Sequence, residues 1–144
     1  MKNIIVFIIS ISAILVFAAP MNSETNINAL IKRQATAWET QNVASLISDF
    51  APDAVFKAGG FTFNGVDAIQ KAAENYFRGF TDTQVVIKRV IIEDNMCAVE
   101  WDWSDRNKKT DNPSAAEDAI VFELRDDGKI VYWREYIEKK KIKQ

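Results

Sequence analysis

The sequence predicts an α+β protein in which three N-terminal helices pack inside a strongly curved antiparallel sheet, giving a cone with one open end. Two observations predict this class. In three segments between residues 27 and 80, apolar side chains recur at the three- and four-residue spacing of amphipathic helices. After Thr81 the apolar period changes to two, which is the spacing of strands. The 144 residues, 48% of them hydrophobic, are enough for one domain with a sizeable core.

The first predicted helix carries a single apolar stripe from Ile27 to Trp38, and Ser23 is one of several polar residues that could cap its start. Asn42 can cap a second, shorter helix whose apolar face ends at Phe50. Pro52 stops this helix, because proline lacks a backbone donor and disfavours helical geometry in the residue before it.

Two short extended pieces separate the second and third helices. Residues 54–57 form the first, a turn follows at Gly59-Gly60, and residues 61–63 alternate apolar and polar. Asn64-Gly65 then opens the third helix, whose apolar stripe runs to Phe80, with the helix ending near Gly79.

The second half of the chain reads as a meander of long strands. Strands are predicted at residues 84–92, 96–104, 119–124 and 129–137, with turns rich in Asp, Asn and Gly in two of the gaps. Residues 105–114 are polar and contain no core-forming side chain, so they are expected to form a long hairpin loop.

The N-terminus has the pattern of a secretory signal. Lys2 supplies a positive charge, an apolar run follows from Ile4 to Val16, and small residues come next. We expect residues 1–18 to be cleaved, leaving a domain at 24–138 and a basic tail at 139–144. The protein is then secreted or periplasmic, with no stable membrane association after cleavage. The alternative is an uncleaved N-terminal anchor.

The composition excludes several kinds of chemistry. With no histidine, the chain has no Ser-His-Asp triad, no His-based zinc site and no imidazole base. The single cysteine, Cys97, rules out an internal disulfide. A net charge of −2 argues against nucleic acid as a partner. Neither a metal site nor an organic cofactor is implied, since hard-cation ligands are not clustered and no phosphate-binding glycine loop is present.

Aromatic residues carry most of the positive information about function. Along residues 96–104, Trp101 and Trp103 share one strand face with Cys97 and Val99. Four tryptophans in a small domain favour a partly open pocket, because indole N–H groups need partners, although a closed core is the alternative. We expect a small apolar or aromatic ligand, bound by the following side chains: Trp38, Phe56, Phe63, Trp101, Trp103, Phe122 and Trp133.

Taken together, several segments resemble the nuclear transport factor 2 superfamily and, within it, the SnoaL-like proteins. The resemblance covers about residues 27–138 and rests on these segments: Ala37-Trp38, residues 46–56, residues 64–69, Val99-Glu100-Trp101, residues 127–130 and Arg134-Glu135-Tyr136. It supports the cone fold. It leaves function open, because the superfamily contains isomerases, dehydratases, cyclases, epoxide hydrolases, binding modules and dimerisation domains.

The resemblance also implies what this chain lacks. Ketosteroid isomerases need a carboxylate base and donors for the developing oxyanion. By rough alignment the base falls at Ala58, the oxyanion-hole tyrosine at Gln34 and the protonated aspartate at Ile120. An enzyme of this sequence therefore needs a different set of residues.

Carboxylates are the remaining candidates for acid–base catalysis. The resemblance implies that Glu135 lies on the strand face inside the cone, where desolvation would raise its pKa. Asp118 could lie near the mouth of the cone. The alternatives are an ion pair or an outward face for Glu135, and a solvated strand end for Asp118.

Three functional classes follow from these observations. The leading hypothesis is a binder of a small apolar molecule, and the second is a carboxylate-dependent isomerase, dehydratase or hydrolase. The third is a homodimeric assembly module without a ligand. The resemblance implies a homodimer in any case, paired through the outer sheet face, on which Val121 lies with Ala98, Glu100 and Asp102.

Overall fold

The computed structural model describes residues 23–141 of the chain, so the signal expected at residues 1–18 lies outside the described residues. The elements are α1 (Glu24–Glu39), α2 (Val43–Ser48), β1 (Phe50–Ala58), β2 (Phe61–Asn64), α3 (Val66–Gly79), β3 (Phe80–Glu93), β4 (Met96–Asn107), β5 (Pro113–Leu124) and β6 (Ile130–Lys139). Across the described part of the chain, no helix is both long and apolar enough to cross a membrane.

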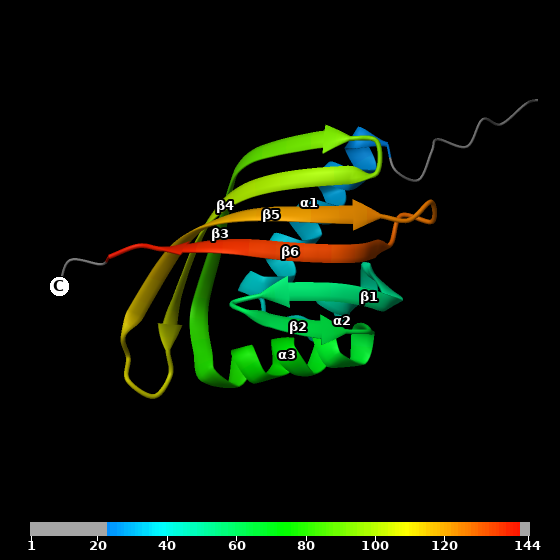
Figure 1. The fold of residues 1–144 in the computed structure, drawn as a ribbon. Helices are drawn as coiled ribbons and strands as arrows, with labels where there is room; N and C mark the ends of the chain where they lie inside the picture. Colours follow the sequence, from blue (N-terminus) through cyan, green and yellow to red (C-terminus); the bar gives the residue numbers. More distant parts are fainter. Residues whose placement is uncertain (1–22, 142–144) are drawn as a thin grey trace, which may run out of the picture.

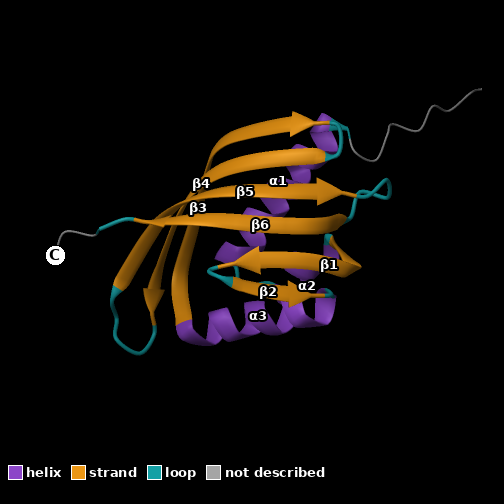
Figure 2. Ribbon diagram, in the orientation of Figure 1, coloured by secondary structure: helices purple, strands orange, loops and turns teal. Residues whose placement is uncertain are grey.

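The helices pack on one side of a single curved sheet, which confirms the predicted α+β class (Figures 1 and 2). The strand order is β2-β1-β6-β5-β4-β3. Every pairing is antiparallel except that between β1 and β6, so the sheet is mixed rather than wholly antiparallel as expected. The meander β3 to β6 starts at the edge far from β1, and its last strand arrives beside β1 running in the same direction (Figure 1).

The core lies between the helices and the concave face of the sheet. The register places Cys97, Phe122 and Trp133 in one row across β4, β5 and β6, and each is no more than 3% exposed. From α1, the buried residues include Ile27, Leu30, Ile31 and Trp38, which is the predicted stripe. The period-two pattern therefore assigned the inner face of the strands correctly.

Several element boundaries differ from the sequence prediction, most clearly at the end of the second helix and at the loop before β5. The second helix ends at Ser48, and Phe50 begins β1 instead of completing the helical face. The expected long loop is short, because β4 runs to Asn107 and β5 starts at Pro113. The polar residue Asp105 is buried inside this extended hairpin, where three side chains bind its carboxylate, so the polar sequence does not interrupt the strand.

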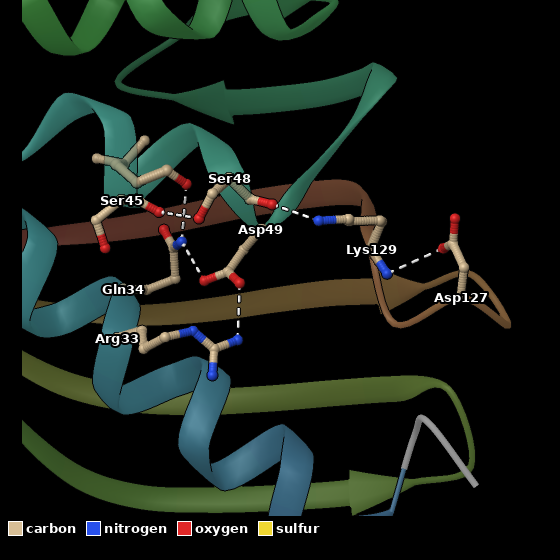
Figure 3. Close-up of polar contacts among 8 residues, drawn as sticks. Arg33, Gln34, Ser45, Ser48, Asp49, Asp127 and Lys129 are labelled. Carbon is tan, nitrogen blue, oxygen red and sulfur yellow. Dashed lines mark hydrogen bonds and ion pairs between the residues drawn. The ribbon is translucent and has the colours of Figure 1, made fainter.

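A polar cluster lies at the end of the sheet opposite the β4–β5 hairpin, where it fixes the helices relative to the strands (Figure 3). Asp49, at the end of α2, accepts hydrogen bonds from Arg33 Nη2 at 2.7 Å and from Gln34 Nε2 at 3.0 Å, both on α1. Lys129, in the β5–β6 turn, donates through Nζ to the Ser48 carbonyl at 2.6 Å. The cluster joins α1, α2 and this turn, and it does not contribute to the cavity described next.

Candidate functional site

The cone contains a cavity of about 840 Å³ at the end of the sheet where the β4–β5 hairpin approaches α3. Its walls come from α1, α3 and all six strands. Seven of the lining side chains are aromatic: Trp38, Phe56, Phe61, Phe63, Tyr76, Phe80 and Trp103. The volume falls in the range of small-molecule sites, and aromatic walls of this kind suit apolar ligands.

The aromatic side of the cavity is held together by edge contacts between rings. Trp38 packs edge-on against both Tyr76 and Trp103, with ring centroids 5.6 Å apart in each case. Tyr76 stacks on Phe80 at 4.9 Å. These contacts link α1, α3, β3 and β4, so side chains from four elements pack together in one wall.

Two carboxylates, Asp118 on β5 and Glu135 on β6, also line the cavity. In the β5–β6 register Ile120 pairs with Glu135 and Asp118 pairs with Ile137, so the two carboxylates are diagonal neighbours on the concave face. Within residues 23–141, neither of them forms an ion pair with a lysine or an arginine. The cavity therefore has an acidic patch in its aromatic wall.

Asp118 is only 6% exposed. Its Oδ2 accepts a hydrogen bond from Trp101 Nε1 at 3.3 Å, and its Oδ1 has no hydrogen-bond partner in the described structure. Burial raises the pKa of Asp118, and the hydrogen bond from Trp101 opposes that rise. A carboxylate oxygen buried without a donor favours either a proton or a positive group nearby.

Glu135 is partly buried, and its Oε1 accepts a hydrogen bond from Trp133 Nε1 at 2.9 Å. Desolvation raises its pKa to about 7; the Trp133 hydrogen bond opposes the rise, and the negative charge of Asp118 adds to it. Glu135 can therefore give up or accept a proton near neutral pH, which is the property that general acid–base catalysis needs.

A further buried carboxylate near the cavity, Asp105, was not anticipated from the sequence. It accepts hydrogen bonds from the Tyr76 hydroxyl at 2.7 Å, from Trp103 Nε1 at 3.0 Å and from the Ser114 hydroxyl. Burial keeps the pKa of Tyr76 above its ordinary value, so the phenol stays a neutral donor. Asp105 is thus a structural centre that fixes the hairpin and the aromatic wall from behind.

Four of the seven aromatic residues expected at the ligand site lie on the cavity wall: Trp38, Phe56, Phe63 and Trp103. The other three, Trp101, Phe122 and Trp133, do not line this cavity, which corrects the expectation that they form its wall. They are at most 1% exposed and pack on one another, with the Phe122 and Trp133 rings 5.1 Å apart. Two of them act from behind the wall instead, because their indole N–H groups hold Asp118 and Glu135.

Three wall aromatics were missed in the sequence: Phe61, Tyr76 and Phe80. Tyr76 and Phe80 belong to the apolar stripe of the third helix, which reads as core when only its period is considered. Phe61 follows the Gly59-Gly60 turn and is 69% exposed at the edge of the cavity.

The positions that align with ketosteroid isomerase residues contribute no catalytic group here. Ala58 lines the cavity with a methyl group, while Ile120 is fully buried in the core. Gln34 is buried and donates its amide to the Leu46 carbonyl and to Asp49, away from the cavity. Among residues 23–141, no group of three or more acidic or cysteine side chains could hold a metal ion.

The outer face carries the remaining acidic pair. Asp102 binds Lys88 at 3.3 Å and Lys140 at 3.2 Å, and Glu100 lies 3.8 Å from Arg89. Both carboxylates point away from the cavity, as the strand parity predicts.

Comparison with solved structures places this fold among known proteins. A protein from Catenulispora acidiphila with a ketosteroid isomerase-like fold, solved in complex with trimethylamine, is 21% identical; the match covers 74% of this chain and 83% of that one, with a TM-score of 0.69. An NTF2-like protein from Exiguobacterium is 17% identical, with coverages of 76% and 98% and a TM-score of 0.68. An LEH-like epoxide hydrolase from M. tuberculosis is also 17% identical, with coverages of 76% and 80% and a TM-score of 0.67.

These identities are low, so the likeness establishes the fold and not the activity. No curated protein matches the chain in sequence. The family profile of the SnoaL-like domain matches residues 31–133, which is more than half of the chain and spans α1 to β6. The chain therefore belongs to the SnoaL-like family and has the NTF2-like fold.

Proposed function

We propose that this protein binds a small apolar or aromatic molecule in the cavity between its helices and its sheet. The observation that carries the proposal is the combination of an 840 Å³ cavity with seven aromatic lining residues. A cavity of this size exceeds the voids of a packed core, and its apolar walls gain free energy when a ligand displaces water from them.

Native mass spectrometry of the protein purified from its source tests the proposal, with a co-purified small molecule as the expected result. A blocked variant makes the test specific. Ala72, on α3, lines the cavity, and Ala72→Trp would fill part of it. Lys71→Trp is the matched control, because the neighbouring residue is exposed and does not line the cavity. Equal ligand occupancy in both variants would contradict binding at this site.

A second candidate function is carboxylate-dependent isomerisation, dehydration or hydrolysis of a small organic substrate. The observation that favours it is the position of Glu135 in the cavity together with its pKa of about 7. Glu135 would transfer the proton, and Asp118 would tune its pKa. Structures of similar fold include an LEH-like epoxide hydrolase, which lends the idea support from the fold alone.

Glu135→Gln separates the two candidates, because it keeps the shape of the side chain and removes the titratable group. For an enzyme, we expect turnover to fall by about 10²–10⁴-fold while the substrate still binds. For a binder, the affinity for a neutral apolar ligand should change little. Glu138→Gln is the control, since Glu138 lies on the same strand and is exposed.

We also propose that the protein is exported. The support is the sequence of residues 1–18, with its positive residue and apolar run. N-terminal sequencing of protein from the native host should give a start at Ala19 or Pro20. A start at Met1 in a membrane fraction would favour an anchor instead.

Finally, we propose a homodimer formed through the outer face of the sheet. The support is a set of exposed apolar side chains on that face: Val86, Ile91, Met96 and Tyr136. Sedimentation at tens of micromolar should show the dimer, because an interface of standard size persists at about that concentration. A monomer alone would count against it.

A further inference from the structure

The acidic patch of the cavity indicates the charge of the ligand that would bind there. Asp118 and Glu135 are diagonal neighbours on the concave face, and both lie in the cavity wall. Each receives one hydrogen bond from a tryptophan N–H, so each keeps an oxygen that no described side chain serves. When they are ionised, two carboxylates in an apolar wall favour a ligand that brings positive charge or hydrogen-bond donors.

The aromatic wall adjoins this acidic patch. Trp103 pairs with Ala116 in the β4–β5 register, and Asp118 is two residues further along the same face of β5. Trp103 and Trp38 are both in the wall, and tryptophan is the ring that attracts cations most strongly through its face. Anionic and π groups thus lie side by side, as they do in sites for ammonium groups.

Two lysines, Lys139 and Lys140, also line this end of the cavity, and neither forms an ion pair with Asp118 or Glu135 among the described residues. Lys140 Nζ is bound to Glu117 at 2.7 Å and to Asp102 at 3.2 Å, on the outer face of the sheet. Lys139 lies on the same concave face as Glu135 and is also a diagonal neighbour of Asp118 in the β5–β6 register. Its side chain is exposed, so solvent screens its charge, whereas Asp118 is only 6% exposed. The other titratable group in the wall is the Tyr76 phenol, which stays neutral because burial raises its pKa.

We infer that the cavity accepts an organic cation: the ligand's ammonium group lies at Asp118 and Glu135 beside Trp103, and its apolar part fills the aromatic wall. This inference rests on the proposed binding function and adds the charge of the ligand. It also predicts a pH dependence. Binding of a cation favours ionised Glu135, so the affinity should rise as pH increases through its pKa of about 7.

Calorimetric titration with three probes of similar size tests the inference: benzyltrimethylammonium, benzyl alcohol and benzoate. At about pH 8 we expect the permanent cation to bind at least tenfold more tightly than the alcohol, and benzoate to bind most weakly. Between about pH 8 and pH 6 the affinity for the cation should fall about tenfold, the limit for a site that must ionise with a pKa near 7. The affinity for benzyl alcohol should not change.

Two variants locate the effect. Glu135→Gln should remove the pH dependence of cation binding, and Asp118→Asn should lower the affinity for the cation while leaving benzyl alcohol unaffected. Glu138→Gln, which makes the same change at an exposed position of β6, should do neither. The pH profile of the unmodified protein decides the question by itself if a variant fails to fold.

The outcomes separate this inference from the function on which it rests. Equal binding of the cation and the alcohol, or a preference for benzoate, would overturn the cationic ligand and leave apolar binding intact. A cation affinity that is unchanged from pH 6 to pH 8 would also overturn it. Failure of all three probes to bind would overturn both proposals.

Discussion

The indole N–H of Trp101 donates to Asp118 Oδ2 at 3.3 Å across the β4–β5 pairing. Trp101 is 1% exposed, so it does not contact a ligand in the cavity, although the carboxylate that it holds does line the cavity. Trp133 has the same relation to Glu135 on β6. The buried tryptophans therefore orient the acidic patch, while other aromatics form the surface that a ligand would touch.

Replacing Trp101 by Phe should remove the donor and leave an aromatic ring in the core. We expect the pKa of Asp118 to rise further, because the lost hydrogen bond is the group that lowers it. We expect a loss of about 2–3 kcal/mol in the free energy of unfolding, from the smaller ring and the unpaired carboxylate. Carboxyl NMR titration and urea unfolding measure the two effects. Trp103→Phe is the control, since its N–H serves Asp105; an unchanged Asp118 pKa in Trp101→Phe would contradict the assignment.

The stability of the protein should decrease as pH rises from about 4.5 to 7. The pKa of Glu135 is raised from 4.5 to about 7 in the folded state, so in this range the folded protein binds more protons than the unfolded chain. The contribution of Glu135 to the free energy of unfolding is therefore largest below about pH 4.5, and it is lost once the pH has risen above about 7. The raised pKa of Asp118 acts in the same direction.

Glu135→Gln tests whether ionisation of Glu135 lowers the stability of the protein as pH rises. The variant cannot ionise, so relative to the unmodified protein it should gain about 1–3 kcal/mol between pH 4.5 and pH 8, the upper figure being reduced by solvent that reaches the cavity. Urea unfolding across this pH range measures the difference. A parallel pH dependence in the two proteins would show that Glu135 is not desolvated.

The fold was largely predictable from the sequence, because the apolar residues follow the helical spacing in the first half of the chain and the strand spacing in the second half with few exceptions. The stripe from Ile27 to Trp38 and the alternation through Trp101 and Trp103 assign each buried face correctly. The parallel pairing of β1 with β6 was not predictable, since it depends on where the meander enters the sheet. Phe50 was misassigned because an apolar residue after a short helix fits either a last helical turn or the start of a strand.

The candidate site was harder to predict, because strand parity identifies a face but not the depth along it. Trp101 and Trp103 are two residues apart on the same face, yet the first is in the core and the second lines the cavity. The boundary between core and cavity along this strand depends on where α3 and the β4–β5 hairpin leave the sheet uncovered. Asp105 was read as part of a polar loop, because its three donors come from distant parts of the chain and from the hairpin itself.

Asp105 should contribute more to stability than any one of its partners. Asp105→Asn keeps the shape but places an amide against donor groups, so we expect a loss of about 2–3 kcal/mol in the free energy of unfolding. Tyr76→Phe removes one donor and should cost about 1 kcal/mol. Urea unfolding of both variants gives the comparison. Losses of equal size would show that the carboxylate does not act as a shared acceptor.

Any side chain at Gly65 should destabilise the protein, because this residue caps α3 with a φ of 82° and a ψ of 155°, a region that is essentially confined to glycine. A Cβ there would lie 3.3 Å from the Pro52 carbonyl oxygen, and the Gly65 N–H already donates to the Ala54 carbonyl at 2.8 Å, so the backbone cannot easily move away. We expect Gly65→Ala to lower the free energy of unfolding by about 1–3 kcal/mol.

Gly79, the last residue of α3, is the control. It has no positive φ, and a Cβ added to it would meet no atom within 4 Å. Gly79→Ala should therefore be neutral or stabilising by up to about 1 kcal/mol. Thermal and urea unfolding of the two variants measure the contrast, and equal effects would mean that the tight entry into α3 is not required for the fold.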